Sequence, residues 1–157
     1  MDSSCKIAVT VVVYNKSCEE SATCQALTAL RHTSVAVLIY DNSVRDFGNA
    51  SYCEKQGWIY FSQGKNVGIS KAYNACIGYL KENTAADYLC LFDDDTAINE
   101  SYFDALNSAI NDSGVDIYVP LVFSAGRLLS PCKIKPNFSV SMFKDEQEAL
   151  LYNGRDI

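Results

Sequence analysis

The sequence predicts an α/β fold in which a mostly parallel sheet carries helices on both faces, as three α/β/α layers. Short β-like apolar runs alternate with amphipathic helical stretches along the chain, and no repeat or low-complexity linker interrupts them. The apolar runs are nearly continuous, as in strands that are buried on both faces. Strand, helix, strand, helix in this order implies parallel neighbours joined by helical crossovers.

The first two expected strands lie in the first third of the chain. Ile7–Tyr14 is rich in β-branched residues. Ser17-Cys18-Glu19-Glu20 has the form of a capping box, in which the serine and the last glutamate satisfy each other's backbone donors, and it predicts a helix to about Arg31. Val35–Tyr40 is the second strand, and it ends in the loop-forming triplet Asp41-Asn42-Ser43.

The middle of the chain predicts a short strand, a helix and a longer strand. Trp58–Phe61 is the short strand, and Tyr88–Phe92 runs directly into Asp93-Asp94-Asp95-Thr96. Between them, apolar residues recur at the i, i+3, i+4, i+7 spacing of a helix that faces the core. The residues expected on that face are Ile69, Ala72, Tyr73, Cys76, Ile77 and Leu80.

The last third predicts less regular structure. A helix fits Asn99–Ile110, with Asn99 as its N-cap and with Phe103, Leu106 and Ile110 facing inward. Ile117–Phe123 is expected as a fifth strand that turns through residues 124–127 into Leu128-Leu129. Lys144–Tyr152 is expected as a short helix. All 157 residues fit one domain.

Composition excludes several classes of protein. Hydrophobic residues make up 48% of the chain and charged residues 20%, which excludes a disordered tail. A net charge of −6 without a Lys/Arg cluster argues against nucleic acid as a partner. The N-terminus lacks a signal-peptide pattern, and no apolar run approaches the length of a transmembrane segment. We therefore expect a cytoplasmic protein, with the inner face of the membrane as a further site of action.

The cysteines indicate reduced, mostly buried side chains. There are seven of them, an odd number, without a CxxC pair, which is typical of small hydrophobic residues in a cytosolic protein. His32 is the only histidine, so a zinc site is not expected. Its position favours a polar residue at the end of a helix.

Chemistry is expected where the strands end. In open α/β sheets, ligands bind beyond the carboxyl ends of the strands. Tyr14-Asn15, Asp41-Asn42 and Asp93-Asp94-Asp95 each follow a predicted strand, and the turn Gly64–Gly68 precedes a helix. Glycines, a lysine and a helix N-terminus suit a phosphate, although an ordinary strand-to-helix turn explains this segment equally well. Tyr14 could stack on a base, but a tyrosine at a strand end is more often a packing residue.

Three consecutive carboxylates after an apolar strand favour a metal site. Like charges at this spacing are destabilising unless a cation lies between them. Mg²⁺ takes one or two protein carboxylates together with waters and phosphate oxygens, so Asp93 and Asp95 could divide the contacts with ligand and metal. The alternative is a solvated acidic turn that caps the next helix.

Four segments resemble a known family. VTVVVYNKS, LIYDNS, GKNVGISKAYNACI and CLFDDDTAI stand in this order and are similar to the N-terminal half of the family 2 glycosyltransferases, most of all the rhamnosyltransferase-like branch. The resemblance spans about Ile7 to Val122. It implies the GT-A fold, a Rossmann-like nucleotide-diphospho-sugar transferase domain. It also implies inverting transfer of a sugar from a UDP or dTDP donor to a glycan or lipid-linked acceptor, as in polysaccharide biosynthesis.

The resemblance also implies roles for individual residues. Tyr14 would lie at the nucleobase, and Asp41 would bind its imide. Asn66, Gly68 and Lys71 would line the diphosphate side of the cleft. The acidic trio resembles the family's DxD motif, in which Asp95 would be the principal ligand of Mg²⁺ or Mn²⁺. Asp93 would lie toward the ribose or the phosphate-bound metal, and Asp94 would contact the nucleotide. Two departures are Tyr40, where members of the family carry a first acid, and Lys71, where many carry arginine.

The catalytic base is not identified. In the resembled family an acid well downstream of the DxD motif activates the acceptor hydroxyl, and that region lies beyond Ile157. Asp145, Glu146 and Glu148 are the nearby acids, and their spacing favours an exposed helix face. We therefore expect donor binding with little or no transfer by this chain alone.

Two other functions compete with this interpretation. One is a non-catalytic nucleotide-sugar-binding module. The other is a haloacid-dehalogenase-like phosphatase, whose Asp-x-Asp motif also follows a strand. In that family, however, the motif follows the first strand rather than the fourth and needs a later lysine and acidic pair.

Overall fold

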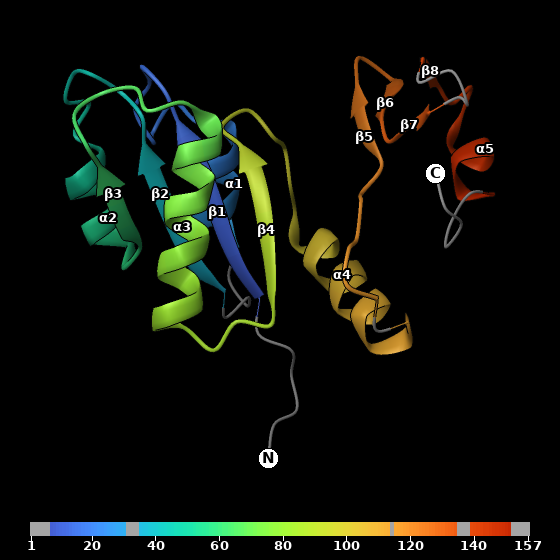
Figure 1. Cartoon of the computed structure of the whole chain (residues 1–157), viewed down its shortest axis with the longest axis horizontal. Helices are drawn as coiled ribbons and strands as arrows, with labels where there is room; N and C mark the ends of the chain where they lie inside the picture. The colour runs from blue at the N-terminus through green and yellow to red at the C-terminus, as the bar shows by residue number, and fades with distance from the viewer. Residues whose placement is uncertain (1–6, 31–34, 114, 135–138, 152–157) are drawn as a thin grey trace. The chain divides into compact units, whose positions relative to one another are not determined.

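The computed structural model describes residues 7–30, 35–113, 115–134 and 139–151. They belong to two compact units, Met1–Ser113 and Gly114–Ile157. The first unit contains a parallel sheet with its helices, and the second contains two antiparallel strand pairs and a short helix (Figure 1). The expectation of a single domain over residues 1–157 stays a prediction.

The first unit is built on a four-stranded sheet in the order β3-β2-β1-β4, in which every pair is parallel. Its strands are β1 (Ile7–Val13), β2 (Ala36–Asp41), β3 (Ile59–Ser62) and β4 (Tyr88–Asp93). The central strand β1 is buried along its whole length, which explains its unbroken apolar sequence. Because all four strands are parallel, their carboxyl ends meet at one edge of the sheet.

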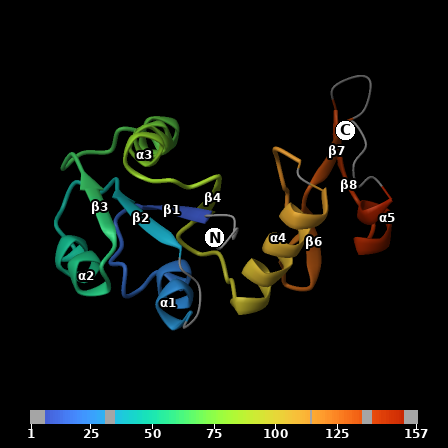
Figure 2. The ribbon, with the colours of Figure 1, turned by 90° about the horizontal axis from the view of Figure 1, so that it is seen from below.

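Helices cover both faces of this sheet (Figure 2). Helix α3 (Ile69–Asn83) lies on one face, and α1 (Ala22–Ala29) and α2 (Asn49–Gln56) lie on the other. Ala72, Cys76 and Leu80 of α3 join a core cluster with side chains of β1 and β2. The predicted α/β/α layering with a mostly parallel sheet is therefore confirmed.

Helix α1 begins later than the capping box predicts. Ser17 and Glu20 do exchange the expected hydrogen bonds, each 3.2 Å long, between backbone N–H and side-chain oxygen. Ser21 then adopts an extended conformation (φ −76°, ψ 120°) and accepts a hydrogen bond from the Cys24 N–H through its own hydroxyl. The capping box therefore closes a separate turn, and Ser21 is the N-cap. Arg31 and His32 lie outside the described residues.

The buried face of α3 is narrower than its apolar spacing suggests. Ala72, Cys76 and Leu80 are buried and Tyr73 is half-buried, but Ile69 and Ile77 are 50% and 40% exposed. Ile77 follows Cys76 by one residue and so points about 100° away from the buried stripe. The prediction that both isoleucines face the core was wrong.

Helix α4 (Glu100–Ser113) follows its prediction closely. The Asn99 side chain accepts a hydrogen bond of 3.2 Å from the Tyr102 N–H, which is the contact of an N-cap residue. Phe103 and Ile110 are buried, and Leu106 is half-buried.

The second unit differs from the expected fifth strand. Only Val122–Ser124 forms a strand (β5), and it pairs antiparallel with β6 (Arg127–Ser130). Ala125 and Gly126 take positive φ between them and make the tight turn. Ile117, at the start of the expected strand, is 79% exposed and has no buried face to keep it in a sheet. The predicted turn into Leu128-Leu129 is present, but the predicted strand length was wrong.

The rest of the second unit is small. Strands β7 (Cys132–Ile134) and β8 (Val140–Met142) pair antiparallel. Helix α5 (Glu146–Leu150) lies within the range Lys144–Tyr152, where a short helix was predicted. Leu128, Phe143 and Ala149 form its buried cluster.

The described cysteines are free thiols, as predicted, and most of them are buried: Cys18, Cys24, Cys53, Cys76 and Cys90 are buried, and Cys132 is partly exposed. Burial raises the pKa of Cys76 to about 11, so its thiol stays protonated at neutral pH. In the part of the chain that the structure describes, no helix has the length and apolar character needed to span a membrane. The expected cytoplasmic location stays a prediction.

Candidate functional site

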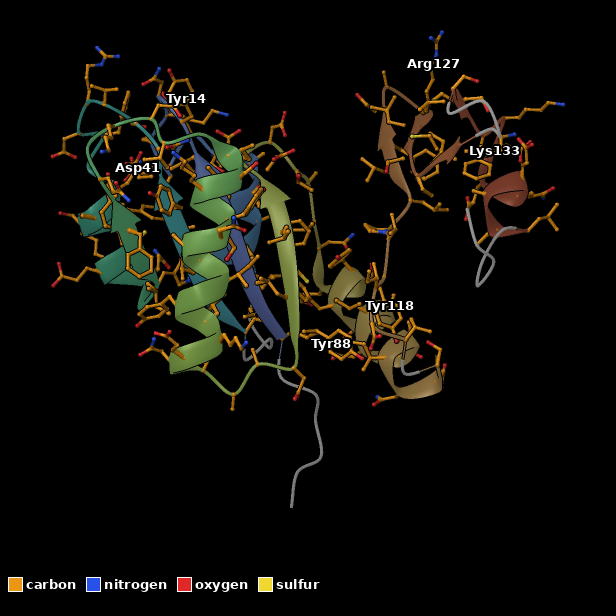
Figure 3. All side chains as sticks on the ribbon, in the orientation of Figure 1. Tyr14, Asp41, Tyr88, Tyr118, Arg127 and Lys133 are labelled. Carbon is orange, nitrogen blue, oxygen red and sulfur yellow. The ribbon has the colours of Figure 1, made fainter. Side chains whose placement is uncertain are left out.

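A cleft of about 600 Å³ lies at the carboxyl ends of the strands of the first unit. Figure 3 shows Tyr14 and Asp41 near this edge, after β1 and at the end of β2. The sequence-predicted residues that line the cleft are Tyr14, Asn66, Gly68, Asp93, Asp94 and Asp95. Val12, Lys16, Asn42 and Ile69 complete the lining. Asp41 and Lys71 were predicted here but are not among the lining residues.

A second hollow, of about 360 Å³, lies at the other end of the sheet, near the amino ends of β2 and β3. None of the described residues that line it carries a charged side chain. The acidic trio lines the cleft at the carboxyl ends instead.

The start of α1 holds the backbone of the acidic turn. The Thr23 hydroxyl donates to the Asp93 carbonyl at 2.5 Å and accepts from the Thr96 N–H at 2.9 Å. The Ser21 hydroxyl donates to the Asp94 carbonyl at 2.7 Å. Both hydroxyl residues are fully buried. The contacts join residues about 70 positions apart in sequence, so no local pattern pointed to them.

The three carboxylates have different surroundings. Asp93 and Asp95 are exposed, and Asp94 is half-buried with its Oδ1 3.0 Å from the Lys16 Nζ. The Tyr73 hydroxyl is within hydrogen-bond distance of two acceptors, the Phe92 carbonyl at 3.3 Å and the Asp93 carboxylate at 3.4 Å. Burial, followed by the charge of Asp93, raises the pKa of Tyr73 to about 12. Tyr73 therefore stays a neutral donor beside the acidic turn.

Asp41 does not line the cleft and is only 2% exposed. Its carboxylate accepts hydrogen bonds from the Ser43 N–H (2.9 Å), the Asn49 side-chain amide (2.8 Å) and the Tyr60 hydroxyl (3.2 Å). Burial and the charge of Asp41 raise the pKa of Tyr60 to about 12. Asp41 thus links the end of β2 to α2 and β3, while the next residue, Asn42, reaches the cleft.

Asn42 is a site residue that the sequence interpretation placed at the edge but gave no role. Its side-chain oxygen accepts from the Val67 N–H at 2.8 Å, and its amide donates to the Asn66 side-chain oxygen at 3.0 Å. The same Asn66 oxygen accepts from the Gly68 N–H at 2.8 Å. These bonds attach the Gly64–Gly68 turn to the end of β2 and place the N-terminus of α3 at the cleft.

The segment after β1 brings Tyr14 and Lys16 into the cleft. Tyr14 is 49% exposed. Asn15 takes a positive φ of 51°, and its N–H donates to the Ser43 hydroxyl at 2.8 Å. This turn directs the following lysine toward the acidic residues.

The acids of the second unit have structural partners. Asp145 caps α5 by accepting from the Glu148 N–H at 2.8 Å. Glu148 forms an ion pair of 2.6 Å with Lys133 and also accepts from the Lys144 N–H. Those two bonds lower the pKa of Glu148. Glu146 is exposed in the first turn of α5.

The sequence profile described as Glycosyl transferase family 2 matches residues 8–154. The chain belongs to this glycosyltransferase family. The predicted family is therefore confirmed, while the rhamnosyltransferase-like branch stays a prediction. A family assignment over almost the whole chain leaves the phosphatase alternative without support.

Solved structures agree in fold. The chain is similar to S. aureus TarS 1-349 in complex with UDP, with a TM-score of 0.62, 19% identity, and coverage of 83% of this chain and 39% of that one. The complex of the same protein with UDP-GlcNAc gives a TM-score of 0.62, 20% identity and coverage of 83% and 38%. The chain therefore spans less than two fifths of these relatives. A search of curated proteins gave no significant match.

Proposed function

We propose that this chain is the donor-binding part of a glycosyltransferase that moves a sugar from a UDP or dTDP donor to a glycan or lipid-linked acceptor, with inversion. The observation that carries the proposal is the cleft at the carboxyl ends of the strands. It gathers the acidic trio, Tyr14 and the turn before α3 within about 600 Å³. The similar TarS structures were solved with UDP and UDP-GlcNAc, which supports the donor class.

The nucleotide would lie across the cleft from β1 to α3. The exposed ring of Tyr14 is suited to stack on the base. Asn66 and Gly68, at the start of α3, would face the diphosphate, where a helix N-terminus favours negative charge. Lys71 is exposed in the first turn of α3 and would approach the diphosphate from the rim. Asp41 is proposed to recognise the base imide, which requires it to exchange one of its three protein donors.

The cleft fits a divalent cation that is shared with the ligand. Among the described residues, no group of three His, Cys, Asp or Glu side chains converges as a complete protein site for a metal. Mg²⁺ needs only one or two carboxylates when phosphate oxygens and waters supply the rest. Asp95 and Asp93, both exposed beside the cleft, would hold Mg²⁺ or Mn²⁺, with Asp94 toward the nucleotide. A bound cation would stabilise the charge of the departing diphosphate.

Thermal unfolding tests the proposal. UDP, dTDP and UDP-sugars should each be added with and without Mn²⁺, because a ligand that binds only the folded state raises the melting temperature. The shift should be larger with Mn²⁺, and Asp95→Ala should abolish the Mn²⁺-dependent part. Asp104→Ala, which removes an exposed acid on α4, is the matched control and should respond like the parent. An Asp95→Ala protein that keeps the full Mn²⁺-dependent shift would show that the metal assignment is wrong.

The acceptor and the base that activates it are not assigned to this chain. Asp145 and Glu148 cap or anchor α5, as described above. We therefore propose donor binding with little or no transfer by residues 1–157. Measurable sugar transfer by this chain would contradict that.

A further inference from the structure

Lys16 is the only basic side chain among the described residues that line the cleft. It shares the cleft lining with three carboxylates, and its Nζ lies 3.0 Å from Asp94 Oδ1. Its side chain is 33% exposed and lines the cleft. The positive φ of Asn15 and the bond from Asn15 N–H to Ser43 fix the turn that aims it there.

The ammonium group of Lys16 has more hydrogen-bond donors than its ion pair with Asp94 uses. An ammonium group is a compact charge with three donors on a flexible stem, and the contact with Asp94 occupies one of them. Lys71, which the family resemblance places at the diphosphate, is exposed and does not line the cleft. A diphosphate that entered the cleft would therefore meet Lys16 as the positive side chain of the described cleft lining.

We propose that Lys16 is a phosphate-binding residue of the donor site, and that its ammonium group exchanges Asp94 for a diphosphate oxygen when a nucleoside diphosphate binds. This inference rests on the proposed function. In the empty cleft, Lys16 offsets one of the three negative charges and occupies Asp94. In the filled cleft, it neutralises phosphate and releases Asp94.

The exchange predicts two effects of opposite sign for Lys16→Met. Affinity for UDP should fall by roughly tenfold or more, the size of one lost charge-assisted hydrogen bond. Affinity for Mn²⁺ alone should rise, because the variant removes a positive charge and frees Asp94. A purely structural lysine would move both affinities in the same direction or leave them unchanged.

Titration calorimetry measures these effects with three ligand sets. They are UDP in the presence of a metal chelator, UDP together with Mn²⁺, and Mn²⁺ alone. Lys16→Arg should keep most of the UDP affinity, because it retains the positive charge. Lys81→Met is the matched control, since Lys81 is exposed in the last turn of α3, at the end of that helix away from the cleft, and does not line the cleft. It should bind all three ligand sets like the parent.

The outcomes separate this inference from the proposed function. If the parent protein binds UDP and Lys16→Met binds it equally well, the role of Lys16 is wrong and the donor site stands. If the parent binds UDP neither with nor without Mn²⁺, both are wrong. If Lys16→Met loses affinity for UDP and for Mn²⁺ together and Lys16→Arg does not restore them, Lys16 has only a structural role.

Discussion

At the scale of single residues, Thr23 connects the sheet edge to the acidic turn through one buried hydroxyl. That hydroxyl donates to the Asp93 carbonyl and accepts from the Thr96 N–H, and the side chain is fully inaccessible to solvent. Backbone groups that lose a partner in such a place cannot recover it from water. The direction in which the carboxylates point therefore depends on a residue that does not line the cleft.

Replacing Thr23 by valine tests this dependence. Thr23→Val keeps the shape but removes the hydroxyl bonds to the Asp93 carbonyl and the Thr96 N–H, which should lower the free energy of unfolding by about 1–3 kcal/mol. Mn²⁺ and nucleotide binding should weaken as the turn loosens. Thr23→Ser retains the hydroxyl and should restore ligand binding. Urea unfolding and calorimetry provide the measurements, and a valine variant with unchanged stability and binding would contradict the role.

Single residues also show what the sequence could predict. Tyr14, Asn66, Gly68 and the acidic trio were found because each directly follows a strand or precedes a helix, which a local pattern reveals. Thr23 was missed because its bonds join segments distant in sequence. The burial of Asp41 was missed for the same reason, since two of its donors, on Asn49 and Tyr60, come from α2 and β3.

At the scale of elements, the turn before α3 depends on the backbone of Gly68. Its φ of 85° is in the left-handed region, while no heavy atom would lie within 4 Å of an added Cβ. A side chain there would therefore cost conformational strain alone. The Asn42 and Asn66 bonds require this turn geometry in order to present the helix N-terminus to the cleft.

Two glycine-to-alanine changes on one helix separate strain from helix propensity. Gly68→Ala should lower the free energy of unfolding by about 1–2 kcal/mol because alanine resists positive φ. Gly78→Ala lies inside α3, also with open space around an added Cβ, and should raise stability by up to about 1 kcal/mol. UDP affinity should fall only for the first. If the denaturant midpoints of both variants shifted in the same direction relative to the parent, this account would be wrong.

Long, strongly patterned elements were predictable, and short ones were not. The core strands agree with their predicted bounds to within one residue at each end, and α3 begins at Ile69, where its apolar pattern begins. Helix α2 was missed because its eight residues include only two buried side chains and its N-cap, Gly48, makes no side-chain bond. The expected strand Ile117–Phe123 has an apolar pattern but mostly exposed side chains, because no sheet face covers it.

At the scale of the whole molecule, two tyrosines couple stability to alkaline pH. Tyr60 donates to Asp41 on one side of the site, and Tyr73 donates to Asp93 on the other. Burial and these carboxylates raise the pKa of both tyrosines to about 12. Each ionised phenolate would face a carboxylate in the folded protein, whereas in the unfolded chain each tyrosine titrates near its ordinary pKa of about 10.

The sign of the pH dependence follows from proton counts. Between about pH 10 and pH 12 the folded state keeps protons on Tyr60 and Tyr73 that the unfolded state has lost, so stability falls as pH rises through this window. Below about pH 10 both states are protonated and the contribution is fully present. The midpoint of urea unfolding, followed by circular dichroism at successive pH values, should therefore decline over this window.

Removing both hydroxyl groups isolates their part of that decline. The double variant Tyr60→Phe, Tyr73→Phe should be less stable at neutral pH, because the bonds to Asp41 and Asp93 are lost. Its stability should then fall less steeply between pH 10 and pH 12 than that of the parent. Tyrosinate absorbance, recorded in the same samples, should show delayed ionisation in the parent while it is folded. Equal slopes in the two proteins would mean that other groups govern the alkaline transition, because the phenylalanine side chains cannot titrate.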